Sequence, residues 1–344
     1  MSSKTESQLE SFLNEQTDMA WRSAVAELAP EIHEVDRAAT QIWFHFFPLA
    51  LLRAFERSDD PARLARELLM QGKWFLREQL DSSHTFLYGH RFWPEVKREV
   101  LKEAPGESFD GRGLAGVVRS VARRVAGAAK VDESLAVGIS AVGLMSLRQV
   151  GVAEFERGPG EVLIDKKHLK RSPEEVLRER ARDDSQGLFS FLRTTDKRWT
   201  VTWDENKDDR RFRVVDMQEV ASGAATDKRP WHELDTRCTI DEGPIPVQCR
   251  SASCGTCWVG VLGGAEKLTE TDWRERKMMP QFGYIETDES HPLIRLSCQA
   301  RATGALSIVI PPWNGYFGKY LKKLKEGSAE TSADETTSDA AVAG

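Results

Sequence analysis

Four of the chain's five cysteines form one pattern that could hold a metal centre. Three of them lie close together as Cys249, Cys254 and Cys257, and Cys298 follows after a further 40 residues. A C-x4-C-x2-C run followed by a distant fourth cysteine is a known ligand spacing of clusters that contain two irons and two sulfides. The pattern therefore predicts one-electron chemistry at a [2Fe–2S] cluster bound by four thiolates.

The composition of the cysteine loop also fits this chemistry. Residues 249–257 read Cys-Arg-Ser-Ala-Ser-Cys-Gly-Thr-Cys, so small side chains fill nearly every gap between the cysteines. Small residues let the backbone wrap closely around a cluster and point its N–H groups at the sulfur atoms. We expect hydrogen bonds to sulfur from Ser251, Ser253 and Thr256, and such bonds help to set the reduction potential.

This part of the chain resembles the plant-type and adrenodoxin-like [2Fe–2S] ferredoxin family over roughly residues 197–315. The resemblance implies that Cys249 and Cys254 hold one iron and that Cys257 and Cys298 hold the other. It also implies a potential of about −400 mV, typical of plant-type clusters. One departure is the gap before Cys298, which is longer than the plant-type gap and predicts an inserted loop within residues 266–290.

Two other interpretations of the cysteines are possible. A structural zinc site usually has two Cys-x2-Cys knuckles, whereas this chain has one, with the third cysteine five positions upstream of it. A disulfide framework is disfavoured by the odd number of cysteines in a long chain. Cys238 stands at no ligand-like spacing, and we interpret it as a buried apolar residue.

Charge and hydropathy narrow the class of protein. The formal net charge of −6 argues against general nucleic-acid binding. The amino terminus has no apolar stretch typical of a signal peptide, so we expect a cytoplasmic protein. The longest uncharged runs, Ala38–Leu52 and Ser134–Leu147, are too short to span a bilayer and predict buried helices instead. A membrane-surface role for the aromatic stretch Trp43–Phe47 is an alternative.

Residues 1–190 are predicted to be a helical domain of unknown role. Helix-start signals recur at Asp60-Pro61, Trp93-Pro94, Asp132 and the capping box Ser172–Glu175. Large anchors for a core are spread across the same region: Trp21, Trp43, Trp74 and Trp93. We expect an irregular bundle of five to seven helices.

The pattern changes to strands after about residue 190. Residues 197–204 and 211–218 predict a hairpin, and 258–262 and 306–310 predict two further strands. By resemblance, residues 191–318 would form a ferredoxin-like β-grasp domain, which makes the fold class α+β with the helical domain first. Residues 319–344 form a basic and then disordered acidic tail.

Two other motifs lie in the helical part. Gly111, Gly113 and Gly116 have the G-x-G-x-x-G spacing of a dinucleotide site, but no strand precedes them, so we interpret them as a helix connection. His84 and His90 could be imagined as a second metal site. Because no carboxylate or cysteine stands at matching spacing, a turn packed with aromatic residues is the favoured interpretation.

The function predicted from these features is one-electron transfer between redox partner proteins. Residues 196–319 hold 17 Lys and Arg against 19 Asp and Glu, so bulk charge gives little steering towards a partner. We therefore expect the helical domain to dock the redox partner. One alternative is an iron–sulfur subunit of a larger oxidoreductase, with the cluster as internal relay, and a weaker one is a cluster-based redox sensor.

Overall fold

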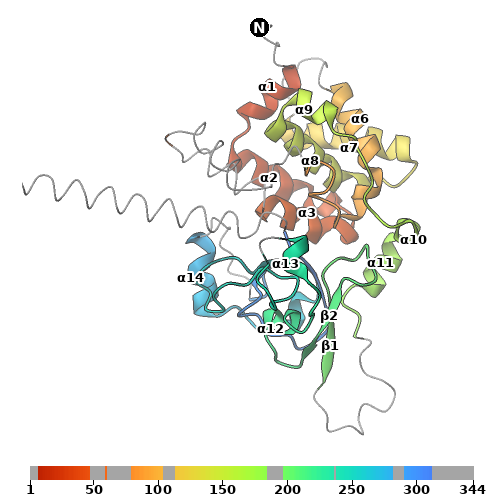
Figure 1. The fold of residues 1–344 in the computed structure, drawn as a ribbon. Helices are drawn as coiled ribbons and strands as arrows, with labels where there is room; N and C mark the ends of the chain where they lie inside the picture. The colour runs from red at the N-terminus through yellow and green to blue at the C-terminus, as the bar shows by residue number, and fades with distance from the viewer. Residues whose placement is uncertain are drawn as a thin grey trace, which may run out of the picture.

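Helices fill the first part of the chain and strands the second (Figure 1). The computed structural model describes residues 7–46, 59, 79–103, 113–183, 197–235, 238–281 and 290–311. It is about half helical, with one small mixed sheet. The predicted domain boundary near residue 190, the Asp60-Pro61 helix start, Trp74 and the tail from residue 319 lie outside the described residues.

The described residues before 184 form nine α-helices, more than the five to seven predicted. The longer ones are α1 (Gln8–Glu15), α2 (Asp18–Leu28), α3 (Glu34–Phe46), α6 (Trp93–Glu103), α7 (Gly113–Ala129) and α8 (Ser134–Val150). The short ones are α9 (Val152–Arg157), α10 (Lys166–Leu169) and α11 (Pro173–Glu179), with the 3₁₀ turns η1 (Ala29–Glu31) and η3 (Tyr88–Phe92).

Local capping explains where several helices begin. The capping box that the sequence predicts at Ser172 is formed, with Pro173 in the first turn of α11. Asp132 accepts the backbone N–H of Ser134 at 2.9 Å, so it satisfies a donor at the start of α8. Gly113 begins α7 and Gly116 lies within its first turn, whereas Gly111 lies outside the described residues, so the helix connection stays a prediction.

The apolar helix α8 is the centre of the first part. Every residue from Leu135 to Leu147 is buried, which confirms the buried helix predicted there. Gly138 allows a close approach, because a Cβ atom at that position would lie 2.3 Å from the hydroxyl of Thr40 on α3. Trp43 and Phe44 on α3 are fully buried, so these two aromatic rings form core rather than a membrane-facing surface.

The sheet has five strands in the order β2-β1-β5-β3-β4. Their bounds are β1 (Arg198–Thr202), β2 (Arg211–Val215), β3 (Trp258–Gly263), β4 (Ile294–Leu296) and β5 (Leu306–Val309). The β1–β2 hairpin is antiparallel as predicted, β1 and β5 are parallel, and β3 is antiparallel to both β4 and β5. The N-terminal and C-terminal strands of this part therefore meet at the middle of the sheet.

Short helices connect these strands. They are α12 (Val220–Ala224), α13 (Trp231–Leu234), η5 (Ala265–Lys267) and α14 (Trp273–Gln281). The sequence predicts an inserted loop within residues 266–290, and the structure places helix α14 inside that range. Only two of its described side chains, Glu275 and Met279, are buried. The segment therefore has no wide apolar face, and its sequence lacks the apolar period that predicts a helix.

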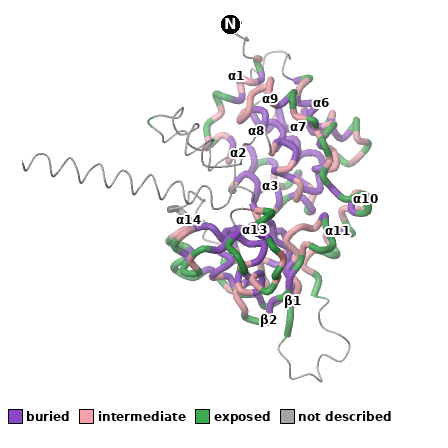
Figure 2. The backbone as a smooth tube through the Cα atoms, viewed as in Figure 1, coloured by how far each residue is buried: buried purple, intermediate pink, exposed green. Residues whose placement is uncertain are grey.

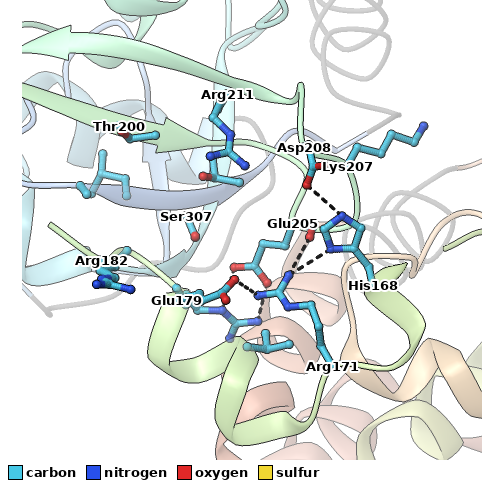
Figure 3. A pocket seen from close by; sticks show the side chains of 16 residues that line it. His168, Arg171, Glu179, Arg182, Thr200, Glu205, Lys207, Asp208, Arg211 and Ser307 are labelled. Carbon is cyan, nitrogen blue, oxygen red and sulfur yellow. Dashed lines mark hydrogen bonds and ion pairs between the residues drawn. The ribbon is translucent and has the colours of Figure 1, made fainter. Parts of the chain in front are cut away.

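The helical part and the sheet pack against each other through one continuous core (Figure 2). Buried polar contacts also cross this seam. The Arg180 guanidinium pairs with both carboxylate oxygens of Glu205, at 2.8 and 2.9 Å, and donates to the Val35 carbonyl at 3.0 Å. A cavity of about 200 Å³ opens beside this pair, and Figure 3 shows Arg171 reaching towards Glu179 and Glu205 at its edge.

No helix among the described residues is long and apolar enough to cross a membrane.

Candidate metal centre

The sheet brings the distant fourth cysteine to the cysteine loop. Cys257 ends the loop immediately before β3, and Cys298 lies just beyond β4. The antiparallel register of these strands places Trp258 opposite Leu296, and the Ser297 N–H donates to the Cys257 carbonyl at 3.0 Å. Strand pairing therefore closes the 40-residue gap that separates the two cysteines in sequence.

The four thiols are arranged as two neighbouring pairs. The thiol of Cys249 is within hydrogen-bonding reach of that of Cys254, and the thiol of Cys257 is within reach of that of Cys298. Among the described residues, no three His, Cys, Asp or Glu side chains converge as ligands of one metal ion. Two pairs of thiols suit two irons, each of which takes two protein ligands, better than they suit one tetrahedral zinc ion.

Backbone N–H groups of the loop point at sulfur. The amides of Ser251 and Ser253 donate to the Cys249 sulfur at 3.4 and 3.3 Å. Residues with positive φ shape this part of the loop, namely Arg250 (54°), Ala252 (62°) and Gly255 (64°). Left-handed residues turn successive N–H groups towards a common side, which makes a concave site for negative charge. The loop is thus built for an anionic group held by thiolates.

Side chains add two further hydrogen bonds to sulfur. The buried Thr256 hydroxyl lies 3.1 Å from the Cys254 sulfur, and the Gln299 side-chain amide donates to the Cys298 sulfur at 3.3 Å. The sequence predicts the contribution of Thr256, whereas that of Gln299 was not predicted. Hydrogen bonds of this kind stabilise negative charge on ligand sulfur.

The two pairs differ in their exposure to solvent. Cys249 and Cys254 are partly exposed, whereas Cys257 and Cys298 are buried. An iron held by the first pair would lie nearer the surface than one held by the second. That position favours electron exchange with a molecule outside the protein.

One thiol of each pair, Cys249 and Cys298, has a lowered pKa, which favours the deprotonated form that metal ligation requires. Burial alone would raise the pKa of Cys249, but hydrogen bonds from Ser253 and Ser251 outweigh it and lower the pKa to about 6. The hydrogen bond from Cys257 lowers the pKa of Cys298 to about 7. The same hydrogen bond and burial raise the pKa of Cys257, so this pair shares one proton when no metal is bound.

Comparison with known families agrees with this geometry. Residues 235–303 match the family model described as a 2Fe-2S iron-sulfur cluster binding domain. This part of the chain is a 2Fe-2S domain. It binds a [2Fe–2S] cluster, and domains of this type transfer electrons to partner proteins. Comparisons of the chain with the curated proteins and with the solved structures gave no match.

Close backbone packing fixes the entry to the cysteine loop of the 2Fe-2S domain. Gly243 has φ of 76°, and a Cβ atom there would lie 2.0 Å from the Ala224 carbonyl oxygen at the end of α12. Only glycine fits both the backbone angle and the space. At the other side of the loop, the Arg250 guanidinium pairs with Glu242 and donates to the Ser222 hydroxyl at 2.9 Å. These contacts hold the loop against α12.

A buried ion pair supports the strand that leads to Cys298, and the sequence gives no sign of it. Glu275 on α14 pairs with Arg295 on β4 at 2.9 and 3.0 Å and accepts the Leu296 N–H at 2.6 Å. Both side chains are almost fully buried. Burial raises the pKa of Glu275, while the charge of Arg295 acts in the opposite direction. The inserted segment is therefore anchored close to the metal centre.

Cys238 lies outside the two pairs of thiols. Cys238 is buried, as expected, and its thiol contacts the Pro244 carbonyl at 3.5 Å.

His84 and His90 form a buried pair in the helical part. Their Nδ1 atoms lie 3.0 Å apart, and the Leu163 N–H donates to Nε2 of His90 at 3.0 Å. His90 must then carry its proton on Nδ1 and donate it to His84. Burial lowers the pKa of both rings, that of His90 to about 4. With the His84 ring packed against Trp93, this is the aromatic-packed turn that the sequence favours.

Proposed function

We propose that the chain is a one-electron transfer protein whose cluster is held by Cys249, Cys254, Cys257 and Cys298. The observation that carries this proposal is the arrangement of the four thiols in two pairs, one partly exposed and one buried. By resemblance, the pair of Cys249 and Cys254 would hold one iron, and the other pair the second. The zinc alternative would require the same four thiols to converge on one tetrahedral ion, whereas they lie as two pairs.

The chain's own residues would control how the cluster accepts and donates its electron. The amides of Ser251 and Ser253 and the hydroxyl of Thr256 would donate to thiolate sulfur and stabilise added negative charge. The fully buried Trp258 and Leu296 would exclude water on the inner side. Electron exchange with a partner would then take place on the solvent-facing side of the cluster loop.

We further propose a ferredoxin-like β-grasp domain over residues 191–318, preceded by a helical domain over residues 1–190. A parallel pair of strands at the middle of a mixed sheet, with short helices between the strands, supports this assignment. A protein of this kind would work in the cytoplasm, where thiols remain reduced.

In this proposal the helical domain docks one redox partner. Its support is the seam between the two parts, because a partner bound to the helices would be held in a fixed position relative to the cluster. The bidentate pair between Arg180 and Glu205 and the bond from Arg180 to Val35 tie both parts together. A fixed position shortens the search for a geometry that permits electron transfer.

A second candidate is an iron–sulfur subunit in which the cluster relays electrons to a site in the helical domain. The packing of α3 directly on β3, the strand that follows Cys257, favours this candidate. A bound organic cofactor or a second metal in the purified protein would support the relay over the carrier.

The first test is anaerobic purification followed by analysis of the metal centre. We expect two irons and two acid-labile sulfides per chain and, after reduction with dithionite, the EPR signal of a reduced [2Fe–2S] cluster. Colourless protein that carries zinc would overturn the proposal.

Cysteine variants test the ligand assignment. Cys257→Ala and Cys298→Ala should each lose the cluster, because each removes one of the four thiolates. Cys238→Ala is the matched control, since Cys238 is also buried but lies outside the two pairs. A cluster that persists in Cys298→Ala, or that is lost in Cys238→Ala, would show that the ligand set is different.

A further inference from the structure

Two large apolar side chains of the sheet-containing part stand exposed to solvent. Trp273 at the start of α14 is 68% exposed, and Met217 after β2 is 48% exposed. A surface hollow of about 500 Å³ is lined by Met217, Arg274 and Cys298 among others, and Trp273 lies between two of its lining residues, Asp272 and Arg274, in sequence. Large apolar side chains that gather at a hollow are typical of an interaction surface.

The backbone conformation at Met217 also supports an interaction surface at this hollow. Its φ is 63°, a left-handed conformation that is unfavourable for a long side chain. Hydrogen bonds hold it there, from the Met217 N–H to the Ala302 carbonyl at 2.8 Å and from the Ala302 N–H to the Gln218 carbonyl at 3.1 Å. The fold thus maintains a costly backbone conformation at a residue whose side chain lies on the surface of the hollow.

The exposed face of α14 is positively charged. Arg274, Arg276 and Lys277 are exposed, whereas the helix's described carboxylate, Glu275, is buried against Arg295. Figure 1 places α14 at the outer edge of the sheet-containing part. Two exposed carboxylates, Glu270 and Asp272, precede the helix, and Asp272 accepts the Glu275 N–H as its cap. The helix itself presents three cations around one tryptophan.

The same helix is tied to the strand that carries a cluster ligand. Glu275 bonds to Arg295 and to the Leu296 N–H, and Cys298 follows two residues later. A molecule that binds to the outer face of α14 would therefore sit close to a thiolate of the cluster. Electron tunnelling requires such a close approach, whereas binding of nucleic acid or lipid does not.

We propose that the α14 face, defined by Met217, Trp273, Arg274, Arg276 and Lys277, docks an electron-transfer protein with an acidic surface. The cations would meet carboxylates of the partner, and Trp273 and Met217 would bury against an apolar side chain at the centre of the contact. One electron would pass from the reduced cluster to the partner's cofactor, with no covalent bond formed or broken. This role rests on the proposed electron-transfer function, and it serves a different partner from the one docked by the helices.

Stopped-flow mixing with two acceptor proteins of opposite charge tests this surface. The dithionite-reduced protein is mixed anaerobically with oxidised flavodoxin, which is acidic, or with oxidised cytochrome c, which is basic. Each acceptor takes one electron, and the flavin semiquinone also takes one proton from water. We expect the rate constant with flavodoxin to fall as salt is raised, and to fall about tenfold in Arg274→Glu/Lys277→Glu and about fivefold in Trp273→Ala.

Matched variants on the helical part serve as controls. Arg123→Glu and Met19→Ala change a similarly exposed cation and apolar residue there, and both should leave the rate with flavodoxin unchanged. The double charge reversal should not slow transfer to cytochrome c.

Several results would overturn the inference. The first is a rate constant with flavodoxin that the α14 variants leave unchanged. The second is an equal fall of that rate constant in the variants of the helical part. The third is binding of DNA or anionic vesicles that the α14 variants abolish while electron transfer is unaffected. The EPR signal of every variant separates these outcomes from failure of the proposed function, which would leave no reducible cluster even in the unmodified chain.

Discussion

Glu275 and Arg295 form an almost completely buried ion pair that joins α14 to the strand before Cys298. The carboxylate also accepts the Leu296 N–H at 2.6 Å. One side chain of the inserted segment therefore organises both the side chain and the backbone of β4.

Removing one partner of this pair should loosen the cluster. In Glu275→Ala the Arg295 guanidinium stays buried without a counter-charge, and we expect a loss of about 3–5 kcal/mol of stability and faster bleaching of the cluster in the presence of a chelator. Visible absorption against time measures the bleaching. The variant Glu275→Leu/Arg295→Met should recover much of the loss, because it leaves no buried charge. If Glu275→Ala and Glu275→Leu/Arg295→Met bleach at the same rate, the unpaired buried charge is not the cause of the bleaching.

The hydroxyl of Thr256 should raise the reduction potential. It lies 3.1 Å from the Cys254 sulfur, and a donor to sulfur stabilises the reduced form more than the oxidised form. A difference of about 1 kcal/mol corresponds to a potential lower by roughly 40 mV in Thr256→Val. Thr256→Ser keeps the hydroxyl and should stay near the original value. Redox titration followed by EPR measures both potentials. An unchanged potential in Thr256→Val would show that the Thr256 hydroxyl does not influence the cluster's potential.

Arg180 should make the two parts of the chain unfold together. Arg180→Ala leaves the largely buried Glu205 carboxylate without its partner and removes the hydrogen bond from Arg180 to the Val35 carbonyl, so we expect a loss of about 3 kcal/mol. Urea unfolding followed by far-UV circular dichroism and by loss of cluster absorption should give coincident curves before the substitution and separate curves after it. Arg123→Ala removes an ion pair with Glu133 that is exposed on both sides and should cost less than about 0.5 kcal/mol. Equal losses in the two variants would contradict the proposed role of the seam.

Acid should weaken the helical part through His90. Its pKa is lowered by burial to about 4, below the ordinary value of 6.5, so the unfolded chain takes up a proton that the folded chain does not. The contribution of the neutral His90 ring to the stability of the folded chain is complete above pH 6.5 and is lost as the pH falls towards 4. At pH 5 the loss from His90 is about 2 kcal/mol relative to pH 7.

A variant isolates this effect from other titrating groups. Burial raises the pKa of Asp36 to about 6, which acts in the opposite direction between pH 7 and 5. We therefore compare the pH dependence of the unmodified chain with that of His90→Gln, whose side-chain oxygen can accept the Leu163 N–H. Urea unfolding at pH 7 and pH 5 should show the variant to be less stable at pH 7 but less sensitive to acid. Parallel pH dependences would mean that His90 does not titrate as described.

The sequence predicted the features that depend on near neighbours. The capping box at Ser172, the β1–β2 hairpin and the buried helix α8 follow from residues within a few positions of one another, and the structure contains all three. The inserted segment was harder, because a polar stretch without a clear apolar face gives no helical period. Helix α14 depends instead on Glu275, whose partner Arg295 lies 20 residues away.

The sequence by itself determined the chemistry of the centre, because cysteine spacing and small loop residues are local requirements of a [2Fe–2S] ligand set. Tertiary structure decided which thiols become neighbours, since the register of β3 and β4 brings Cys298 to Cys257. It also decided which surface adjoins the centre. Trp273 and the cations of α14 are exposed only because Glu275 faces inward, and no spacing along the chain specifies that orientation.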